Sequence, residues 1–483
     1  MVDNFPSFRL LAPENTGLIV KNGQGIRMAE PSLRKRIWGW FFFDWASQPF
    51  HTVLLTFIFG PFFVSIAADA FVAEGQASEA AKASAQSMWS LTLTVTGLII
   101  GFGAPFLGAV ADTSGRRMPW ILAFSAMYVV GAGALWWTNP DGSNLSWMLI
   151  VFAFGFIGAE YALIFINAQL PSLASEDEIG QVSGSGFAFG YAGGVLSLFL
   201  LLLLIVEQPN GKTLIGFDPM FGLLDASGRE GTRFAGPFVA FWFAVFMIPY
   251  FSWVREVSDP NPGATIGKAL SNLWQSIRNL RLHKSLSTYL GSSMLYRDAL
   301  NGLYSFGGTF AVLVMDFSVV EVGVFGIIAA SAAAIFSYVG GRADKRFGPK
   351  PVIIVTIWVL IGVCAVLVNL SPESVFGVAI AEGSGVPTQI FYLCGCLIGG
   401  MGGILQSASR SLMVRHSNPK SPTESFGLYG LCGRATSFIA PALIGIATAV
   451  TGSAQLGVAP LILLFLLGLV LLRWVNPKGE VFA

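Results

Sequence analysis

Charged residues are scarce in this chain of 483 residues, because Lys, Arg, Asp and Glu together make up only 11% of it. Soluble domains carry roughly 25% charged residues, so an ordinary water-soluble fold is excluded. The formal net charge is only +1, and binding to a nucleic-acid backbone needs a large basic excess. Nucleic acid is therefore not an expected partner.

Residues that build metal and catalytic sites are also few, with four cysteines and three histidines. Cys394 and Cys396 fall on opposite sides of a helix, and all four cysteines lie in apolar stretches, which argues against a metal site or a disulfide framework. The histidines are scattered and show no nucleophile with a base. No GxxxxGK[ST] motif occurs, so ATP is not expected to drive the protein. We predict neither an enzyme nor a bound cofactor.

What the chain has in abundance is apolar sequence: 54% of its residues are hydrophobic, including 41 Phe and 13 Trp, and it has 56 Gly. Twelve apolar runs are long enough to cross a membrane core, which needs about 20 residues each. The sequence thus predicts an all-α polytopic membrane protein with twelve transmembrane helices. The runs lie near 37–66, 86–110, 119–138, 145–170, 181–206, 235–254, 285–315, 320–341, 351–370, 388–412, 425–450 and 456–474.

The distribution of basic residues between the runs predicts the orientation. If both termini are cytoplasmic, the outer segments hold only four basic residues, Lys82, Lys212, Arg229 and Arg233, and most of the others lie inside. We therefore expect a multi-pass protein of the cytoplasmic membrane with both termini cytoplasmic. The predicted units are a tail at 1–33, a six-helix bundle at 34–254, a cytoplasmic linker at 255–284, a second six-helix bundle at 285–475 and a tail at 476–483.

The linker contains an amphipathic stretch, IGKALSNLWQSIRNLRLHKSL at 266–286. Its apolar residues recur at helical spacing and its basic residues fall on other faces, which is typical of a helix lying in a membrane interface. The alternative is a helix that binds a partner protein, as calmodulin targets do. The apolar set is Ile266, Leu270, Leu273, Trp274 and Ile277, and the basic set is Lys268, Arg278, Arg281 and Lys284.

Two motifs recur at about half the chain length. GAVADTSGRR at 108–117 and GGRADKRFGPK at 340–350 place Asp112 and Asp344 232 residues apart, and SGSGFAFG at 183–190 aligns with FGLYGLCG at 426–433. Each offset relates one run to the sixth run after it, so we predict two pseudo-symmetric six-helix halves with a substrate site between them. We expect charge pairs in GAVADTSGRR and GGRADKRFGPK, at the cytoplasmic face, to hold two helices together in one state. These gating residues are Asp112, Gly115, Arg116, Arg117, Asp344, Lys345 and Arg346.

GAVADTSGRR also resembles the signature of the major facilitator superfamily, with Thr113 where Arg or Lys is usual. Further stretches are similar to the autophagy-related vacuolar effluxer branch of that superfamily, over roughly residues 34–475. The resemblance implies a twelve-helix fold, alternating access and amino-acid efflux. Arg434 stands where that branch usually has Lys. The stretches are FFFDWASQPF (41–50), INAQLPSLA (166–174), QVSGSGFAFGYAGG (181–194), RDALNGLYSFGG (297–308), SASRSLMVR (407–415) and FGLYGLCGRATSFIAPALIG (426–445).

Six ionisable residues fall inside the predicted membrane helices, and an unpaired charge there costs at least about 2.5 kcal/mol. Their charges cancel: the acids are Asp44, Glu160 and Asp298, and the bases are Arg297, Arg410 and Arg434. Polar residues share a helix face with most of them. These stripes lie on helices one, four, seven and ten, which line the central cavity in the family that the chain resembles. They are Asp44–Gln48–His51, Glu160–Asn167, Asp298–Asn301 and Gln406–Arg410.

Each of these residues also has a structural interpretation. Asp44 and Asp298 could make hydrogen bonds between helices, Arg410 could extend to the membrane surface, and His51 could be a packing residue. Arg434 lies about nine residues inside the eleventh helix, which favours a role in the cavity.

Carboxylates and guanidinium groups in one cavity suit a solute that carries both charges, because arginine clamps a carboxylate and an acid meets an ammonium group. We therefore predict a secondary transporter of an amino acid or short peptide, acting as a monomer and coupled to protons. One alternative is an exporter of drugs or amphipathic compounds, and another, of a different class, is a membrane sensor that transports nothing.

Overall fold

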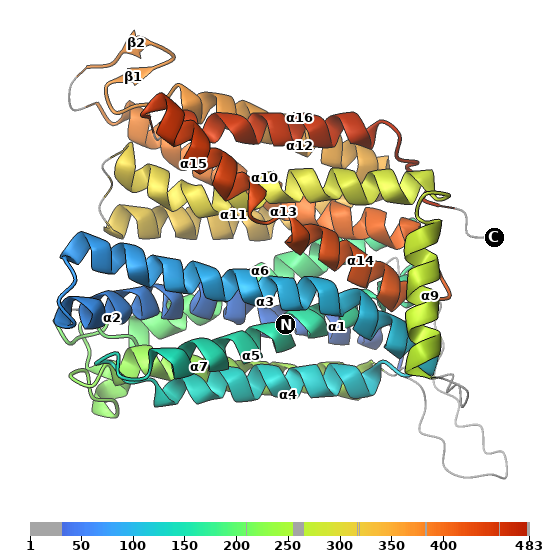
Figure 1. Cartoon of the computed structure of the whole chain (residues 1–483), viewed down its shortest axis with the longest axis horizontal. Coiled ribbons are helices and arrows are strands. Elements are labelled where there is room, and N and C mark those ends of the chain that lie inside the picture. The colour runs from blue at the N-terminus through green and yellow to red at the C-terminus, as the bar shows by residue number, and fades with distance from the viewer. Residues whose placement is uncertain are drawn as a thin grey trace.

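The computed structural model describes residues 31–208, 210–254, 265–315, 317, 319–381, 384–453 and 455–480. The predicted tail at 1–33 lies almost wholly outside these residues, as do 255–264 of the predicted linker. Nearly all long helices run side by side along one axis, and α9 (Ile266–Asn279) crosses one end of the bundle (Figure 1). This end is called the α9 end below.

The N-terminal half contains the first six predicted spans. α1 and the helices up to α8 pack around aromatic side chains such as Trp40, Phe43 and Phe152, all fully buried. The helices of this half are α1 (Leu33–Pro49), α2 (Phe59–Ala73), α3 (Ser78–Ser114), α4 (Met118–Ala134), α5 (Leu145–Asn167), α6 (Ile179–Leu204), α7 (Glu230–Phe246) and α8 (Ile248–Trp253).

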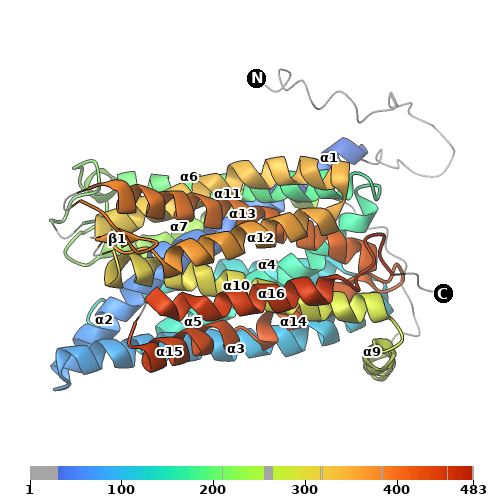
Figure 2. The same ribbon diagram turned by 90° about the horizontal axis from the view of Figure 1, so that it is seen from above.

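The C-terminal half contains the other six, with a two-stranded hairpin at the end opposite α9 (Figures 1 and 2). Its helices are α10 (Lys284–Leu313), α11 (Val319–Phe347), α12 (Pro349–Val368), α13 (Val386–His416), α14 (Pro422–Ala435), α15 (Ile439–Thr451) and α16 (Ala459–Leu472). The hairpin pairs β1 (Ser374–Val375) with β2 (Val378–Ala379) in antiparallel register.

Within the described residues, eleven helical segments are long and apolar enough to cross a membrane. α10 is not among them, although it runs the length of the bundle and packs against α16 (Figure 1). It occupies the place of the seventh predicted span and carries Arg297 and Asp298, which reduce its apolar character. The chain is thus a multi-pass membrane protein with the predicted all-α fold.

The first span is interrupted at Pro49. Proline cannot donate the helical hydrogen bond, and the chain continues as a π-helical segment, η2 (Phe50–Phe57), before α2 begins. This wider helical turn contains His51, whose ring reaches Glu160 of α5. The proline therefore positions a residue of the candidate site.

The eleventh span is broken between α14 and α15, at Thr436–Phe438. The backbone amide of Ala440, near the start of α15, donates to Oδ2 of Asp298 at 3.0 Å. An acidic side chain is favourable there because the first amides of a helix lack partners and the helix dipole is positive at that end.

Two helix pairs form most of the interface between the halves: α3 with α14, and α6 with α11. A Cβ atom at Gly184 of α6 would lie 2.6 Å from Cα of Gly341 of α11, and one at Gly108 of α3 would lie 2.7 Å from the carbonyl oxygen of Thr423. Small residues permit such close approach of membrane helices. Both contacts lie toward the α9 end, so the structure is closed there.

We expect Gly184→Leu to prevent this closure, because overpacking a tight contact costs about 1–3 kcal/mol. The variant should populate a conformation open at the α9 end at least about fivefold more than the native chain. Spin-label distances between Asp177→Cys and Lys420→Cys, one in each half, measure the change. Gly362→Leu is the matched control, since a Cβ atom there meets nothing within 4 Å; equal distances in both variants would contradict the prediction.

Candidate functional site between the two halves

A buried ion pair joins the halves near the α9 end. Nη1 and Nη2 of Arg410 (α13) each lie 3.3 Å from Oδ2 of Asp44 (α1). Nη1 also donates to Oδ1 of Asn167 at 3.0 Å, and Nε donates to Oγ of Ser183 at 2.9 Å. One guanidinium group thus contacts α1, α6 and the end of α5 in the other half.

Aromatic rings enclose this ion pair. The guanidinium carbon of Arg410 lies 4.5 Å from the ring centre of Trp40 and 4.1 Å from that of Phe187. Arg410 is only 2% exposed, so its side chain does not extend to the membrane surface. The structure therefore excludes that alternative for Arg410.

A second ion pair joins the halves and is more accessible. Arg434 (α14) pairs with Oε1 of Glu160 (α5), which also lies 3.0 Å from Nε2 of His51. The Arg434 guanidinium lies over the ring of Phe156. Glu160 is 7% exposed, whereas the side chains of Arg434 and His51 are 29% and 30% exposed. The side chains of Arg434 and His51 are therefore partly exposed, whereas the carboxylate of Glu160 is enclosed by protein.

Three other predicted polar residues, Gln406, Gln48 and Asn301, take no part in the two ion pairs. Gln406 donates to the hydroxyl of Tyr191 at 3.1 Å, which adds another contact between the halves. Gln48 packs beside Gly194 within the N-terminal half, and Asn301 is exposed.

Arg297 and Asp298 contact residues of their own half. Nη1 of Arg297 donates to the carbonyl oxygen of Tyr429 at 3.2 Å, and the guanidinium stacks over that ring. Asp298 is 3% exposed, and its Oδ1 has no hydrogen-bond partner among the described residues. The structure thus brings Asp44, Glu160, Arg410 and Arg434 to the interface and separates Asp298 from them.

The first predicted gating motif lies at a contact between the halves. Asp112, at the end of α3, accepts from Arg117 at 2.9 Å and from the backbone amide of Glu424 at 2.9 Å. Glu424 lies in the first turn of α14, so Asp112 caps a helix of the other half. Gly115 ends α3 with a φ of +67°, a conformation that glycine adopts without strain. Arg116 is exposed.

The second motif differs from the expected charge pairing. Asp344 is buried beside Gly180 at the start of α6 and forms no ion pair among the described residues. Lys345 instead donates to Oε1 of Gln181 at 3.1 Å, and Arg346 lies over the ring of Phe347. Consecutive helical residues point in different directions, which is why Asp344 faces α6 while Lys345 and Arg346 do not pair with it.

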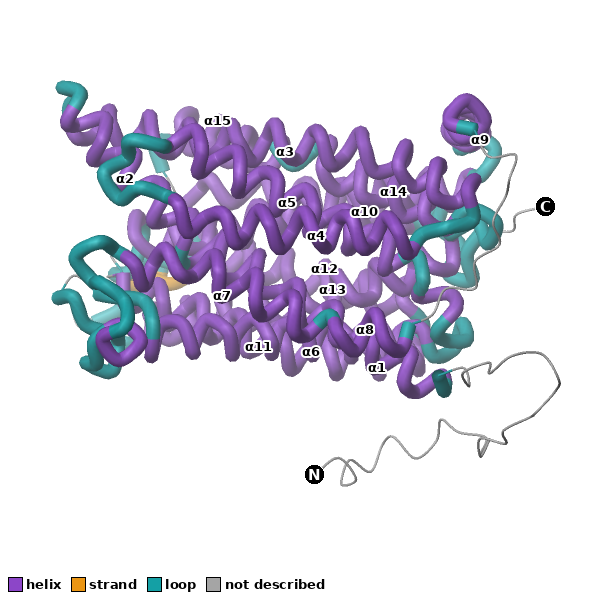
Figure 3. Tube along the Cα trace, turned by 90° about the horizontal axis from the view of Figure 1, so that it is seen from below, coloured by secondary structure: helices purple, strands orange, loops and turns teal. Residues whose placement is uncertain are grey.

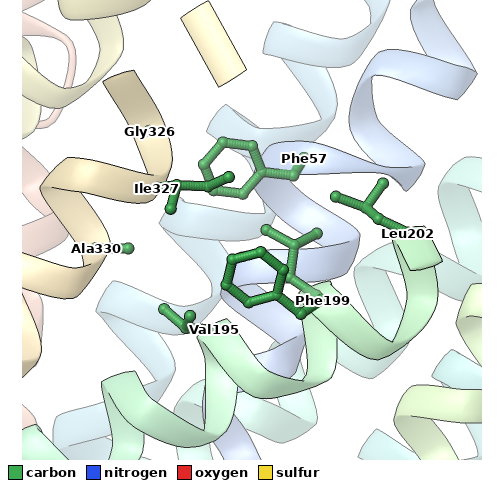
Figure 4. A pocket seen from close by; sticks show the side chains of 8 residues that line it. Phe57, Val195, Phe199, Leu202, Gly326, Ile327 and Ala330 are labelled. Carbon is green, nitrogen blue, oxygen red and sulfur yellow. The ribbon is translucent and has the colours of Figure 1, made fainter. Parts of the chain in front are cut away.

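Metal ligands and pockets were the other candidate features of a binding site. Among the described residues, no group of three His, Cys, Asp or Glu side chains could hold a metal ion. A small pocket between α6 and α11, toward the end opposite α9, is lined only by apolar residues (Figure 4). The lining therefore has no charged or polar side chain that could bind a charged solute. It consists of Phe57, Val195, Leu198, Phe199, Leu202, Gly326, Ile327 and Ala330.

Sequence reasoning missed several residues that hold these ion pairs. Trp40 precedes Asp44 by four residues and therefore shares its helix face, a spacing that could have indicated it. Ser183 and Phe187 are also four apart on α6, but nothing in the sequence shows which helix of the other half they meet.

The match with known families covers this whole membrane region. Residues 32–480 match the family described as vacuole effluxer Atg22 like. The chain belongs to this family, within the major facilitator superfamily. It is therefore a multi-pass transporter of the class that works by alternating access.

Individual relatives agree with this assignment. An uncharacterized MFS-type transporter, YxiO of Bacillus subtilis, is 23% identical over 90% of this chain and 94% of its own length. Autophagy-related protein 22-2 of Emericella nidulans is 26% identical over 62% of this chain. The match covers about half of that fungal protein, 51% of its length.

Solved structures share the fold at low sequence identity. The proton:xylose symporter XylE superposes with a TM-score of 0.68 at 12% identity, covering 93% of this chain and 96% of its own. The transporter FucP in its outward conformation superposes with a TM-score of 0.63 at 13% identity, covering 91% of this chain and 98% of its own.

Proposed function

We propose that the protein transports a small zwitterionic solute, an amino acid or short peptide, and binds it between Glu160 and Arg434. The observation that carries this proposal is the ion pair itself, whose members come from opposite halves and whose arginine is 29% exposed. A solute at this position contacts both halves, as alternating access requires.

An exchange of ion pairs explains why the solute should carry both charges. Its carboxylate can take Arg434 while its ammonium group takes Glu160, so every charge keeps an opposite partner. A solute with a single charge would leave Glu160 or Arg434 unpaired, and an unpaired buried charge is strongly destabilising. Hydrogen bonding from His51 keeps the carboxylate of Glu160 in place.

A thermal-shift screen of the purified protein tests the proposal, because a ligand of the folded state raises apparent stability by about 2.7 kcal/mol at one hundred times its Kd. Amino acids and short peptides should raise the melting temperature, and matched organic acids and amines should not. Glu160→Gln should remove the shift, while Glu176→Gln, an exposed glutamate away from the site, should keep it. A shift produced only by amphipathic drugs would contradict the proposal.

Proton coupling is assigned to Asp298. Asp44 and Glu160 already hold a guanidinium group, whereas Asp298 is buried with one oxygen unpartnered among the described residues. We expect Asp298→Asn to abolish accumulation driven by a pH gradient while solute exchange continues, since the amide oxygen can still accept from Ala440. Uptake and exchange in proteoliposomes separate the two activities. Unchanged accumulation would give Asp298 the structural role of capping α15.

We further propose that the protein is a monomer in the cytoplasmic membrane, with both termini and the α9 end cytoplasmic. The excess of basic residues in the segments assigned to that side supports this orientation. Membrane-impermeant labelling of Lys420→Cys, at the α9 end, should require permeabilised cells.

A further inference from the structure

α9 lies across the bundle, perpendicular to the long helices, at the outer margin of α3 and α14 (Figures 1 and 3). Ala269 is buried where α9 packs on α3. One face of α9 is therefore occupied by the protein, and the helix runs across the direction in which the spanning helices cross the membrane.

A second face of α9 is apolar and uncovered. Four apolar side chains at helical spacing are exposed, and the largest, Trp274, is 69% exposed. The set is Ile266, Leu270, Trp274 and Ile277. Tryptophan is enriched at membrane–water interfaces, where part of its ring is apolar and part is hydrated.

The remaining surface of α9 carries positive charge only. Lys268 and Arg278 are exposed, and Arg281 and Lys284 follow directly after the helix. Residues 266–286 contain neither Asp nor Glu. An apolar face beside a polar one whose only charges are positive complements a membrane surface with anionic headgroups.

α9 also contacts both helices that close the α9 end. It packs along α3, and the side chain of Ser276 lies beside that of Glu424 in the first turn of α14. The backbone amide of Glu424 donates to Asp112 of α3. When α3 and α14 separate, α9 cannot keep both contacts.

We propose that α9 binds anionic phospholipid headgroups of the adjacent leaflet and thereby favours the conformation closed at the α9 end. Lipid fixes α9 beside α3 and α14, and its contacts with both helices are complete only while the two are together. The inference is independent of the identity of the solute.

The test uses the full chain in nanodiscs of phosphatidylcholine alone or with phosphatidylglycerol. The spin labels at Asp177→Cys and Lys420→Cys report closure, in a background where the four native cysteines are replaced and transport is retained. Each basic side chain near an anionic surface contributes a factor of about five, so anionic lipid should raise the ratio of closed to open molecules at least about fivefold.

Lys268→Gln with Arg278→Gln should reduce this lipid effect at least about fivefold. Lys82→Gln with Lys212→Gln removes the same charge from exposed residues at the opposite end and should preserve it. A label at Leu270→Cys should be accessible to oxygen in the bilayer, and one at Gln275→Cys to a water-soluble relaxant. Populations that do not respond to phosphatidylglycerol, or a water-exposed Leu270 label, would overturn the proposal; so would an equal response in both charge variants.

Discussion

Arg434→Ala is expected to reduce transport at least about 30-fold, because truncating one partner of a buried charge pair costs about 2–5 kcal/mol. The change leaves the carboxylate of Glu160, 7% exposed, without its guanidinium partner. It also removes the group proposed to bind the carboxylate of the solute. Initial uptake rates in proteoliposomes, normalised to the amount of folded protein, measure the loss.

Arg434→Lys should keep part of the transport, since it retains the charge but loses the planar, two-pronged donor. Arg473→Ala removes an exposed arginine just beyond α16 and serves as the matched control, with transport expected to be unchanged. If Arg434→Ala left rate and affinity unaltered, Arg434 would have no role in the site.

Asp44→Ala is expected to lower the free energy of unfolding by about 3–5 kcal/mol, the usual cost of breaking a buried ion pair from one side. Arg410 would remain at 2% exposure with only the neutral acceptors Asn167 and Ser183. Thermal unfolding in detergent, compared with the native chain, gives the change.

The double variant Asp44→Ala with Arg410→Leu should recover most of this stability, because replacing both members of a buried pair by apolar residues is often nearly neutral. A single variant as stable as the native chain, or a double variant less stable than the single one, would show that the pair does not contribute in this way.

Hydropathy and the internal repeat predicted the fold because membrane helices must be long and apolar, and a duplicated motif survives in sequence. The α14–α15 break and the η2 segment were not predicted. The break involves a partner distant in sequence, Asp298, and Pro49 alone does not specify that the chain continues as a π-helical segment.

The charges at the interface were predicted as a set but not as pairs. The cost of burying a charge identifies Asp44, Glu160, Arg410 and Arg434 as residues that need partners. Which acid meets which base is decided by the register between helices of opposite halves, and a single sequence does not contain that information. For the same reason the sequence placed Asp298 with the other acids, although it faces α15.

The most direct test of the account is uptake into proteoliposomes of a matched series: a neutral amino acid, the same molecule without its amino group, and the same molecule without its carboxylate. We expect saturable uptake of the amino acid alone, competition only by compounds that carry both charges, and loss of uptake in Glu160→Gln. Equal transport of the singly charged compounds, or solute binding without any flux, would contradict it.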